Sequence, residues 1–415
     1  MACPGCGAAG AEVFFRSPPL PVLSNEVVRT RAAALAAPRG EIALARCPAC
    51  DLVHNAAFDP AAVRYTGEYE NALHFSPRFR AYAEELAQGL VARHGVRRGL
   101  VVELGCGDGA FLALVCRLGD NRGVGFDPAH DGARALPLPA GVTIHARPVA
   151  ASDAGLQPDL ICCRHVLEHV AEPRTLLATV QRLAGARPEA VVFFEVPNAR
   201  HTLERLAIWD VVYEHCLYFS ATALAGLFRR SGFVPLAVRE TYGGQFLTIE
   251  ARPATPAGAS AGGAADRGPS APADRAPGAP VDPGSATGGV ASEPGGLEPL
   301  TRAFARAHAD TLARWRDVLG RVDREGTPAV VWGAGSKAVT FLNLLGATDR
   351  TIRCVVDVNP RKQGAYVVGT GQAIVAPDRL REVRPGLVLV MNPLYRDEVE
   401  AELARLRVAA RVLVA

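Results

Sequence analysis

A glycine-rich turn after a short apolar segment carries the strongest chemical signal in the sequence. The apolar segment contains Glu103, and a second apolar segment further on ends at Asp127. The turn itself consists of Gly105, Cys106, Gly107 and Gly109. Glycines at this spacing let backbone N–H groups approach a ligand at the start of a helix, while a distant acid can accept a hydrogen bond from a ribose hydroxyl. The pattern predicts a site for a ligand that contains a nucleoside.

The acid in front of the turn separates two classes of nucleotide-binding enzyme. Glu103 followed by the G-x-G-x-G spacing resembles the S-adenosylmethionine (SAM) methyltransferases more than the NAD enzymes. The resemblance implies that SAM is the cofactor, that Glu103, the turn and Asp127 bind it, and that the reaction is methyl transfer.

A second group of polar side chains, residues 163–169, follows an apolar, strand-like segment. His165, Glu168 and His169 match the H-x-x-E-H string of one class of zinc proteases. The context opposes that interpretation, because the string leaves a buried strand and does not lie within a helix. In SAM enzymes this strand end borders the cofactor and substrate pocket, so His165 or His169 could face the reaction. Each histidine could equally cap and pack the next helix.

A third group, residues 209–220, follows the fifth apolar segment of the same region. Tyr213, Glu214 and His215 place a hydroxyl, a carboxylate and a base of near-neutral pKa side by side. An aromatic-rich turn in the core is the other interpretation. We favour a catalytic role, because the polar groups cluster beside a predicted strand end.

A second glycine turn lies in the C-terminal part of the chain. Gly333 and Gly335 fit the spacing G-x-G-x-x-A, Lys337 lies within it, and Asp357 ends the next apolar segment. This is a literal dinucleotide fingerprint. It could bind NAD, hold the phosphates of a substrate, or be a structural feature of a Rossmann-like unit. We expect a phosphate-facing or structural role, because a SAM site already supplies the chemistry.

The cysteines divide into a metal-binding set and a scattered set. Two C-x-x-C pairs supply Cys3, Cys6, Cys47 and Cys50. Each pair aims two thiolates at one point, and two pairs complete a tetrahedral site without an open position, which predicts structural zinc. A redox pair is the alternative, but neither C-x-x-C opens a helix of a βαβ unit. The other cysteines are spread through predicted elements, which indicates a reduced, cytoplasmic protein.

Composition and charge limit the possible partners. The chain has 415 residues, of which 49% are hydrophobic and 21% charged, as is usual for a globular protein of several domains. A net charge of +3 gives no reason to expect nucleic acid or a membrane surface as a partner. No apolar run approaches the ~20 residues that span a bilayer, and the N-terminus lacks a secretory pattern.

The polar groups require an α/β scaffold to position them. Residues 61–98 have helical apolar spacing, and strand-like and helical segments alternate from 99 to 250, which predicts a mainly parallel, doubly wound sheet. Residues 252–298 are almost wholly Ala, Gly, Pro and Ser, which predicts a disordered linker. The predicted order is an N-terminal zinc ribbon (1–60), a Rossmann-like domain of class I SAM methyltransferases (61–251), the linker (252–298) and a smaller C-terminal Rossmann-like domain (299–415).

Four features together resemble the nucleotide-sugar C-methyltransferases of deoxysugar biosynthesis. They are the paired C-x-x-C motifs, the turn after Glu103, the Y-E-H segment, and a terminal unit with the stretch D-x-N-P-x-K-Q-G. The resemblance implies methylation of a carbon next to a ketone of a nucleotide-linked sugar through an enolate. It also implies that His215 is the catalytic histidine, with Tyr213 and Glu214 as neighbours, and it matches His169 to a second active-site histidine only loosely.

The segments that would contact the substrate depart from this family. The family's Y-H-E-H reads Y-E-H, its E-Y-x-Y reads E-Y-E-N around Tyr69, and its H-G-G-S reads Y-G-G-Q at 242–245. The expected substrate-binding residues are Tyr69, Gly333, Gly335 and Lys337. Three alternatives remain: a SAM-dependent O- or N-methyltransferase, an NAD enzyme that uses the second glycine turn, and a zinc ribbon that binds protein or nucleic acid. The near-neutral charge disfavours the last.

Overall fold

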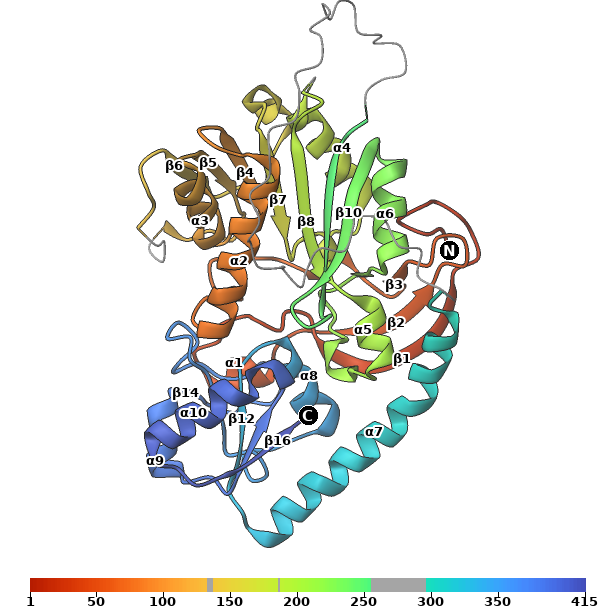
Figure 1. Ribbon diagram of the computed structural model, residues 1–415. Coiled ribbons are helices and arrows are strands. Elements are labelled where there is room, and N and C mark those ends of the chain that lie inside the picture. The colour runs from red at the N-terminus through yellow and green to blue at the C-terminus, as the bar shows by residue number, and fades with distance from the viewer. Residues whose placement is uncertain (133–136, 186, 255–295) are drawn as a thin grey trace, which may run out of the picture.

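The computed structural model describes residues 1–132, 137–185, 187–254 and 296–415 (Figure 1). Three β-sheets organise these residues, with four, seven and five strands. Most of the predicted linker, 255–295, lies outside the described residues. Within the described part of the chain, no helix has the length and apolar character needed to cross a membrane.

The seven-stranded sheet is central and has the order β10-β11-β8-β7-β4-β5-β6. The strands from β4 to β8 run parallel, and β10 and β11 add an antiparallel hairpin at one edge. The bounds are β4 (Leu100–Leu104), β5 (Arg122–Phe126), β6 (Val142–His145), β7 (Leu160–Arg164), β8 (Val191–Pro197), β10 (Phe233–Thr241) and β11 (Phe246–Pro253). The prediction of a mainly parallel sheet for this region is confirmed.

Helices cover both faces of the central sheet because its strands are apolar on both sides. On one face, Val101 of β4 packs in a cluster with residues of α2 (Pro77–His94) and α3 (Ala110–Gly119). On the other face, its neighbour Val102 packs with α4 (Pro173–Ala184) and α6 (Ala221–Arg230). Successive side chains of a strand point to opposite faces, so both residues are fully buried.

The helix predicted from residue 61 begins only at Pro77. Ser76 caps α2 by accepting a hydrogen bond from the Phe79 N–H, and proline at the first position cannot extend the helix backwards. The segment before it instead approaches the C-terminal unit, where the Ser76 hydroxyl donates to Glu398 at 2.7 Å. Apart from a single 3-10 turn at Pro60–Ala62, the helical prediction for residues 61–76 was therefore wrong.

The N-terminal sheet contains one strand that the sequence analysis did not anticipate. Its order is β1 (Glu12–Pro21), β2 (Arg39–Arg46), β3 (Val53–Asn55) and β9 (Leu217–Tyr218), and all pairs are antiparallel. β9 belongs to the central part of the chain and starts two residues after His215. A two-residue strand has no period that a sequence could reveal.

The C-terminal unit is a parallel sheet of order β14-β13-β12-β15-β16. Its strands are β12 (Ala329–Trp332), β13 (Cys354–Val356), β14 (Ile374–Val375), β15 (Leu387–Val390) and β16 (Arg411–Val414). The accompanying helices are α8 (Ser336–Leu345), α9 (Leu380–Val383) and α10 (Arg396–Leu406), and two short helices, α1 (Arg31–Leu35) and α5 (Ala199–Glu204), lie elsewhere.

The N-terminal sheet and the C-terminal unit share one apolar core. The long helix α7 (Glu298–Glu325) begins beside β1 and runs on toward the C-terminal unit (Figure 1), and the rings of Phe15 and Phe304 meet edge to face at 5.3 Å. The same cluster continues to Phe341 of α8. Burial of this continuous surface fixes the N-terminal sheet between the two larger sheets.

Candidate active site

The turn after β4 has a backbone that requires glycine. Gly105 has φ +66°, and a Cβ on it would lie 2.2 Å from Cγ2 of Val166. Gly107 and Gly109 also have positive φ, and Gly109 precedes the first residue of α3. A side chain at position 105 would be both strained and in collision with its neighbour. The turn therefore keeps its backbone open towards the space beyond it.

A cavity of about 650 Å³ lies beside this turn, at the carboxyl ends of β4, β5 and β7. Ligands of open α/β sheets bind at this edge. Of the predicted cofactor-binding residues, six line the cavity, namely Glu103, Gly105, Cys106, Gly107, Asp127 and His165. The seventh, Gly109, does not line the cavity and is the N-cap residue of α3. The predicted Tyr69 and His169 line the same cavity.

The acids of the cavity suit a ligand with an ammonium group and a ribose. Burial raises the pKa of Glu103 to about 8, and its Oε2 has no hydrogen-bond partner among the described residues. Asp127 accepts the Gly107 N–H at 2.8 Å and the Ala129 N–H at 2.7 Å, one on each oxygen. Each oxygen keeps a lone pair for a ribose hydroxyl, and a cationic group would satisfy Glu103. The residues therefore fit SAM.

Two histidines and a tyrosine meet at the other end of the cavity. Nδ1 of His169 lies 2.8 Å from the Tyr65 hydroxyl and 3.1 Å from the carbonyl oxygen of Glu214. A carbonyl oxygen only accepts, so Nδ1 carries a hydrogen in that bond. The His215 ring meets the His169 ring edge to face at 4.8 Å. His169 lines the cavity, whereas His215 is absent from the lining and contacts the His169 ring.

The surroundings set the protonation of these groups. Burial, together with the neighbouring imidazoles of His169 and His165, lowers the pKa of His215 well below its ordinary value. His215 is therefore a neutral imidazole near pH 7, with a lone pair that can accept a proton. Burial also raises the pKa of Tyr65, so its hydroxyl keeps its hydrogen. The pair offers one proton acceptor and one proton donor.

Glu214 holds Tyr69, one of the residues that line the cavity, in place. Its carboxylate accepts the Ser24 N–H at 3.0 Å and the Tyr69 hydroxyl at 2.9 Å. Burial raises the pKa of Glu214, and burial with the same carboxylate raises that of Tyr69. Both carboxylate oxygens are thus engaged by protein groups, which indicates that Glu214 orients Tyr69 rather than contacting the reacting atoms.

Tyr213 points away from the cavity. Its hydroxyl accepts the Asp59 N–H at 2.9 Å, and its ring packs so tightly against Gly40 that a Cβ there would lie 2.1 Å from it. The structure therefore brings His169 and His215 together with Tyr69 and Glu214, but places Tyr213 in the N-terminal core. The neighbouring residue types gave no indication of this, because adjacent side chains in an irregular segment can face opposite ways.

His165 belongs to a buried charge network at the end of β7. Burial alone would lower its pKa, but Glu168 and Glu195 raise it to about 9. Glu195 lies 2.9 Å from His165 Nε2 and 2.8 Å from Arg164 Nη2. These cations hold the pKa of Glu195 at about 2 although it is fully buried. His165 has a left-handed φ of +54°, so its cavity-facing position carries backbone strain.

The second glycine turn faces a different environment. The cavity beside Ala334 measures only about 10 Å³, and Lys362 fills the space next to it, donating to the Ala334 carbonyl at 2.9 Å. Lys337 pairs with Asp210 at 2.9 Å. Asp357 accepts the Ala334 N–H at 2.7 Å. None of the predicted substrate residues of this turn lines the large cavity, which favours the structural alternative for Gly333 and Gly335.

Among the cavity residues that the sequence analysis missed are Tyr65, Arg164 and Arg361. Tyr65 lies four residues before Tyr69, and the two rings meet edge to face at 4.8 Å. Arg164 ends β7 and lies over the Phe111 ring at 4.1 Å. Arg361 reaches the cavity from the C-terminal unit and pairs with Asp108, inside the first glycine turn, at 3.0 Å. For Arg361 a signal existed, because it occupies the variable position of the D-x-N-P-x-K-Q-G stretch.

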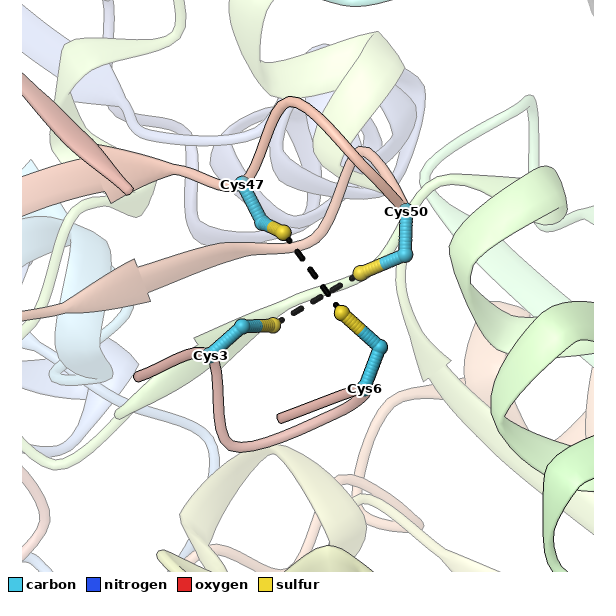
Figure 2. Close-up of side chains that lie close together, drawn as sticks. All are labelled: Cys3, Cys6, Cys47 and Cys50. Atoms are coloured by element: carbon cyan, nitrogen blue, oxygen red, sulfur yellow. Dashed lines mark hydrogen bonds between the residues drawn. The ribbon is translucent and has the colours of Figure 1, made fainter. Parts of the chain in front are cut away.

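The four N-terminal cysteines converge on one point. Figure 2 shows all four side chains turned towards one another, with Sγ–Sγ distances of 3.6 Å for Cys3 with Cys50 and for Cys6 with Cys47. A tetrahedral zinc ion with Zn–S bonds of ~2.3 Å needs sulfur separations of ~3.8 Å. The donor set and its spacing therefore fit a tetrahedral cation, and all ten cysteines of the chain are free thiols.

Two parts of the chain match the models of known protein families. The family described as "Methyltransferase domain" matches residues 76–238, and the family described as "C-methyltransferase C-terminal domain" matches residues 298–414. Together the two matches include the glycine turn, the histidine-bearing loop and the C-terminal unit with Arg361.

Individual proteins are also similar to parts of the chain. The chain is 27% identical over 327 residues to the C-methyltransferase NovU of Streptomyces niveus, a match that covers 77% of this chain and 72% of the relative. It is 30% identical over 159 residues to the ubiquinone biosynthesis O-methyltransferase of Cronobacter sakazakii, covering 36% of this chain and 61% of that protein. A solved 1,6-didemethyltoxoflavin-N1-methyltransferase of Burkholderia thailandensis, 19% identical, covers 52% of this chain and 96% of its own with a TM-score of 0.34.

Proposed function

We propose that this chain, a SAM-dependent methyltransferase of the C-methyltransferase family, methylates the carbon next to a ketone in a nucleotide-linked deoxysugar. One observation carries the proposal: a single cavity has the glycine turn with Glu103 on one wall and Tyr65 with His169 on another. A cofactor site and an acid–base group thus face the same space. Positioning of two reactants against each other supplies much of the acceleration in such reactions.

Proton removal is the first chemical problem, because a C–H bond beside a ketone is only weakly acidic. We assign His215 as the base, with His169 as the imidazole between it and the cavity. The C–H bond breaks, the proton passes to the cavity-lining imidazole of His169 and on to His215, and the electron pair moves to the carbonyl oxygen of the acceptor. The low pKa of His215 leaves it unprotonated and ready to accept at neutral pH.

The negative charge that forms on the acceptor oxygen requires a donor. His169 Nδ1 can donate to the oxygen of Tyr65, which leaves the Tyr65 hydroxyl hydrogen free to point into the cavity. A hydroxyl that is aimed before the charge develops stabilises the enolate without reorganising. When bound, SAM supplies the electrophilic methyl group, whose carbon–sulfur bond breaks as the enolate carbon forms the new carbon–carbon bond.

The assignment can be tested by exchange of the acceptor's α proton with deuterated water in the absence of SAM. With a nucleotide-linked 4-keto sugar, the wild-type chain should catalyse exchange and His215→Ala should not. His308→Gln, on α7 against Phe15, is the matched control and should retain exchange. Persistent exchange in His215→Ala would show that another group is the base.

Transfer to oxygen or nitrogen is the second candidate, because O-methyltransferases are among the relatives that match the central domain. In that reaction His215 would deprotonate a hydroxyl or amine. Mass spectrometry of the product, with fragments that locate the methyl group, separates the two: a methyl group on carbon supports the enolate route, and one on a heteroatom contradicts it.

We also propose that the four N-terminal cysteines bind structural zinc. The support is the geometry of the sulfurs and the lack of any other ligand type in the cluster. Such a site requires reduced thiols, which agrees with a location in the cytoplasm. Metal analysis of the purified chain should find about one zinc per chain, and Cys6→Ser with Cys50→Ser should remove it.

A further inference from the structure

The loop that carries His215 is completed by the N-terminal sheet. β9, which follows this residue, has one strand partner among the described residues, β3, with Val53 opposite Tyr218 and His54 opposite Leu217. The Asn55 N–H donates to the carbonyl oxygen of Cys216 at 2.9 Å. The residue next to His215 is therefore hydrogen-bonded to the end of β3.

The side chains of the two residues before His215 also accept hydrogen bonds from the N-terminal part of the chain. Tyr213 accepts the Asp59 N–H and Glu214 accepts the Ser24 N–H, and both donors belong to the N-terminal part of the chain. The central domain adds contacts of its own, such as the Cys216 thiol, which donates to the Glu168 carbonyl at 3.4 Å. The histidine thus lies where two domains meet. Both hold its backbone: the Asn55 N–H bonds to the Cys216 carbonyl, and His169 Nδ1 bonds to the Glu214 carbonyl at 3.1 Å.

The four-cysteine cluster is joined directly to β3. Cys50 lies three residues before Val53, and the Cys47 N–H donates to the Leu52 carbonyl at 2.9 Å. Leu52 is fully buried and packs in one apolar cluster with Leu217 of β9. Cys3, Cys47 and Phe219 belong to that same cluster. Any displacement of the two cysteine turns would therefore be transmitted to the strand that pairs with β9.

We propose that the four-cysteine cluster positions His215: a tetrahedral cation joins the two cysteine turns, fixes β3 and thereby orders residues 213–219 against the cavity. The inference rests on the proposed function in taking His215 as the base. The glycine turn that would bind SAM is held by hydrogen bonds within the central domain. The Gly105 N–H donates to the Phe126 carbonyl at 2.7 Å, and the Gly107 N–H donates to the Asp127 carboxylate. SAM binding should consequently survive loss of the cation, while proton transfer should not.

The first experiment removes the metal from the full-length, zinc-loaded chain with a chelator. Backbone hydrogen exchange of residues 216–219 should rise about tenfold or more, because the loop loses its anchor. The α-proton exchange rate should fall by a similar factor, and the SAM Kd from calorimetry should stay within about threefold. Added Zn²⁺ should restore both rates, whereas Mg²⁺, which prefers oxygen ligands, should not.

A second experiment leaves the cysteines intact. Asn55 Oδ1 accepts the Ala43 N–H at 2.9 Å and the Ala57 N–H at 3.1 Å, which holds the end of β3. Asn55→Ala removes both hydrogen bonds and should lower kcat for α-proton exchange with less effect on KM. Asn55→Asp keeps an oxygen in place and should restore most of the rate. Cys354→Ser, a buried cysteine of β13 outside the cluster, is the control and should leave the loop protected.

The outcomes separate the two ideas. Unchanged hydrogen exchange at 216–219 after metal removal would overturn the positioning role. Equal loss of SAM affinity and proton transfer would also overturn it, because the cluster would then support the whole fold. If His215→Ala retains α-proton exchange, the base assignment fails, whereas the metal dependence of loop protection is measured independently and still decides whether the cluster orders this loop.

Discussion

Two turns of the chain have almost the same sequence pattern and different surroundings. Each follows a buried parallel strand, contains glycines at a G-x-G spacing, opens a helix and has an acid at the end of the next strand. The turn after β4 borders a cavity of about 650 Å³, and the turn after β12 borders one of about 10 Å³. The motif therefore specifies the local backbone, while neighbouring segments decide whether a ligand can enter.

The polar groups around the second turn are bonded to other parts of the chain. The buried Lys362 bridges the Ala334 carbonyl and the Asn25 side chain, each at 2.9 Å. Lys337 is paired with Asp210 of the central domain. At the first turn, by contrast, Arg361 of the C-terminal unit pairs with Asp108, and the cavity beside the turn remains. We therefore expect the first turn to bind the cofactor and the second to join the C-terminal unit to the central domain.

The largest effect in this comparison should come from substituting glycine in each turn. Gly105→Ala adds a Cβ at 2.2 Å from Val166 on a residue with φ +66°, so SAM affinity should fall by about 100-fold or more. Gly335→Ala meets nothing within 4 Å and has φ −94°, so SAM affinity should be unchanged. Calorimetric titration of both variants measures this. Equal losses would show that the second turn also serves the cofactor.

The two acids provide the next largest contrast. Asp127→Asn weakens a charged acceptor at the predicted ribose position and should raise the SAM Kd by about 30-fold, or ~2 kcal/mol. Asp357→Asn should leave the SAM Kd unchanged and lower the unfolding temperature, because this carboxylate accepts N–H groups of Ala334 and Asn359 at 2.7 Å. A stability loss in Asp127→Asn without weaker SAM binding would contradict the contrast.

The strand ends beside the two turns differ in charge, which predicts a pH effect for the central sheet. β7 is followed by His165, whose pKa is raised from 6.5 to about 9, whereas β15 is followed by the neutral Met391 and Asn392. Stability from a raised histidine pKa is fully present below pH 6.5 and is lost as the pH rises through 9. After discounting for partial exposure of the ring, we expect a loss on the order of 2 kcal/mol.

Unfolding in denaturant between pH 6 and 10 tests this effect. The wild-type chain should lose stability across that window, and His165→Gln should show a flatter profile. His308→Gln should retain the wild-type slope. Parallel slopes for wild type and His165→Gln would mean that His165 is not a cation in the folded state.

The local sequence pattern predicted the residues of the glycine turn, but not the residues that reach the cavity from other parts of the chain. Glu103 and Asp127 were found because strand, turn and helix follow one another within a short stretch of chain. Tyr65, Arg361 and the partner of β9 were not found, because they reach the site through tertiary contacts over long sequence separations. The orientation of Tyr213 was likewise set by packing against Gly40 and not by its neighbours in the sequence.

The smallest expected effect decides between the two interpretations of the second turn. Lys337 pairs with Asp210 in a half-buried setting, so Lys337→Met should cost only about 1 kcal/mol of stability. If the turn is a structural joint, KM for a nucleotide-linked acceptor stays the same. If Lys337 releases Asp210 to bind phosphate, KM rises about tenfold, with the same small loss of stability. Asp210→Asn separates the two cases further. If the turn is a joint, the variant only loses stability; if Lys337 binds phosphate, the variant frees the lysine and lowers KM.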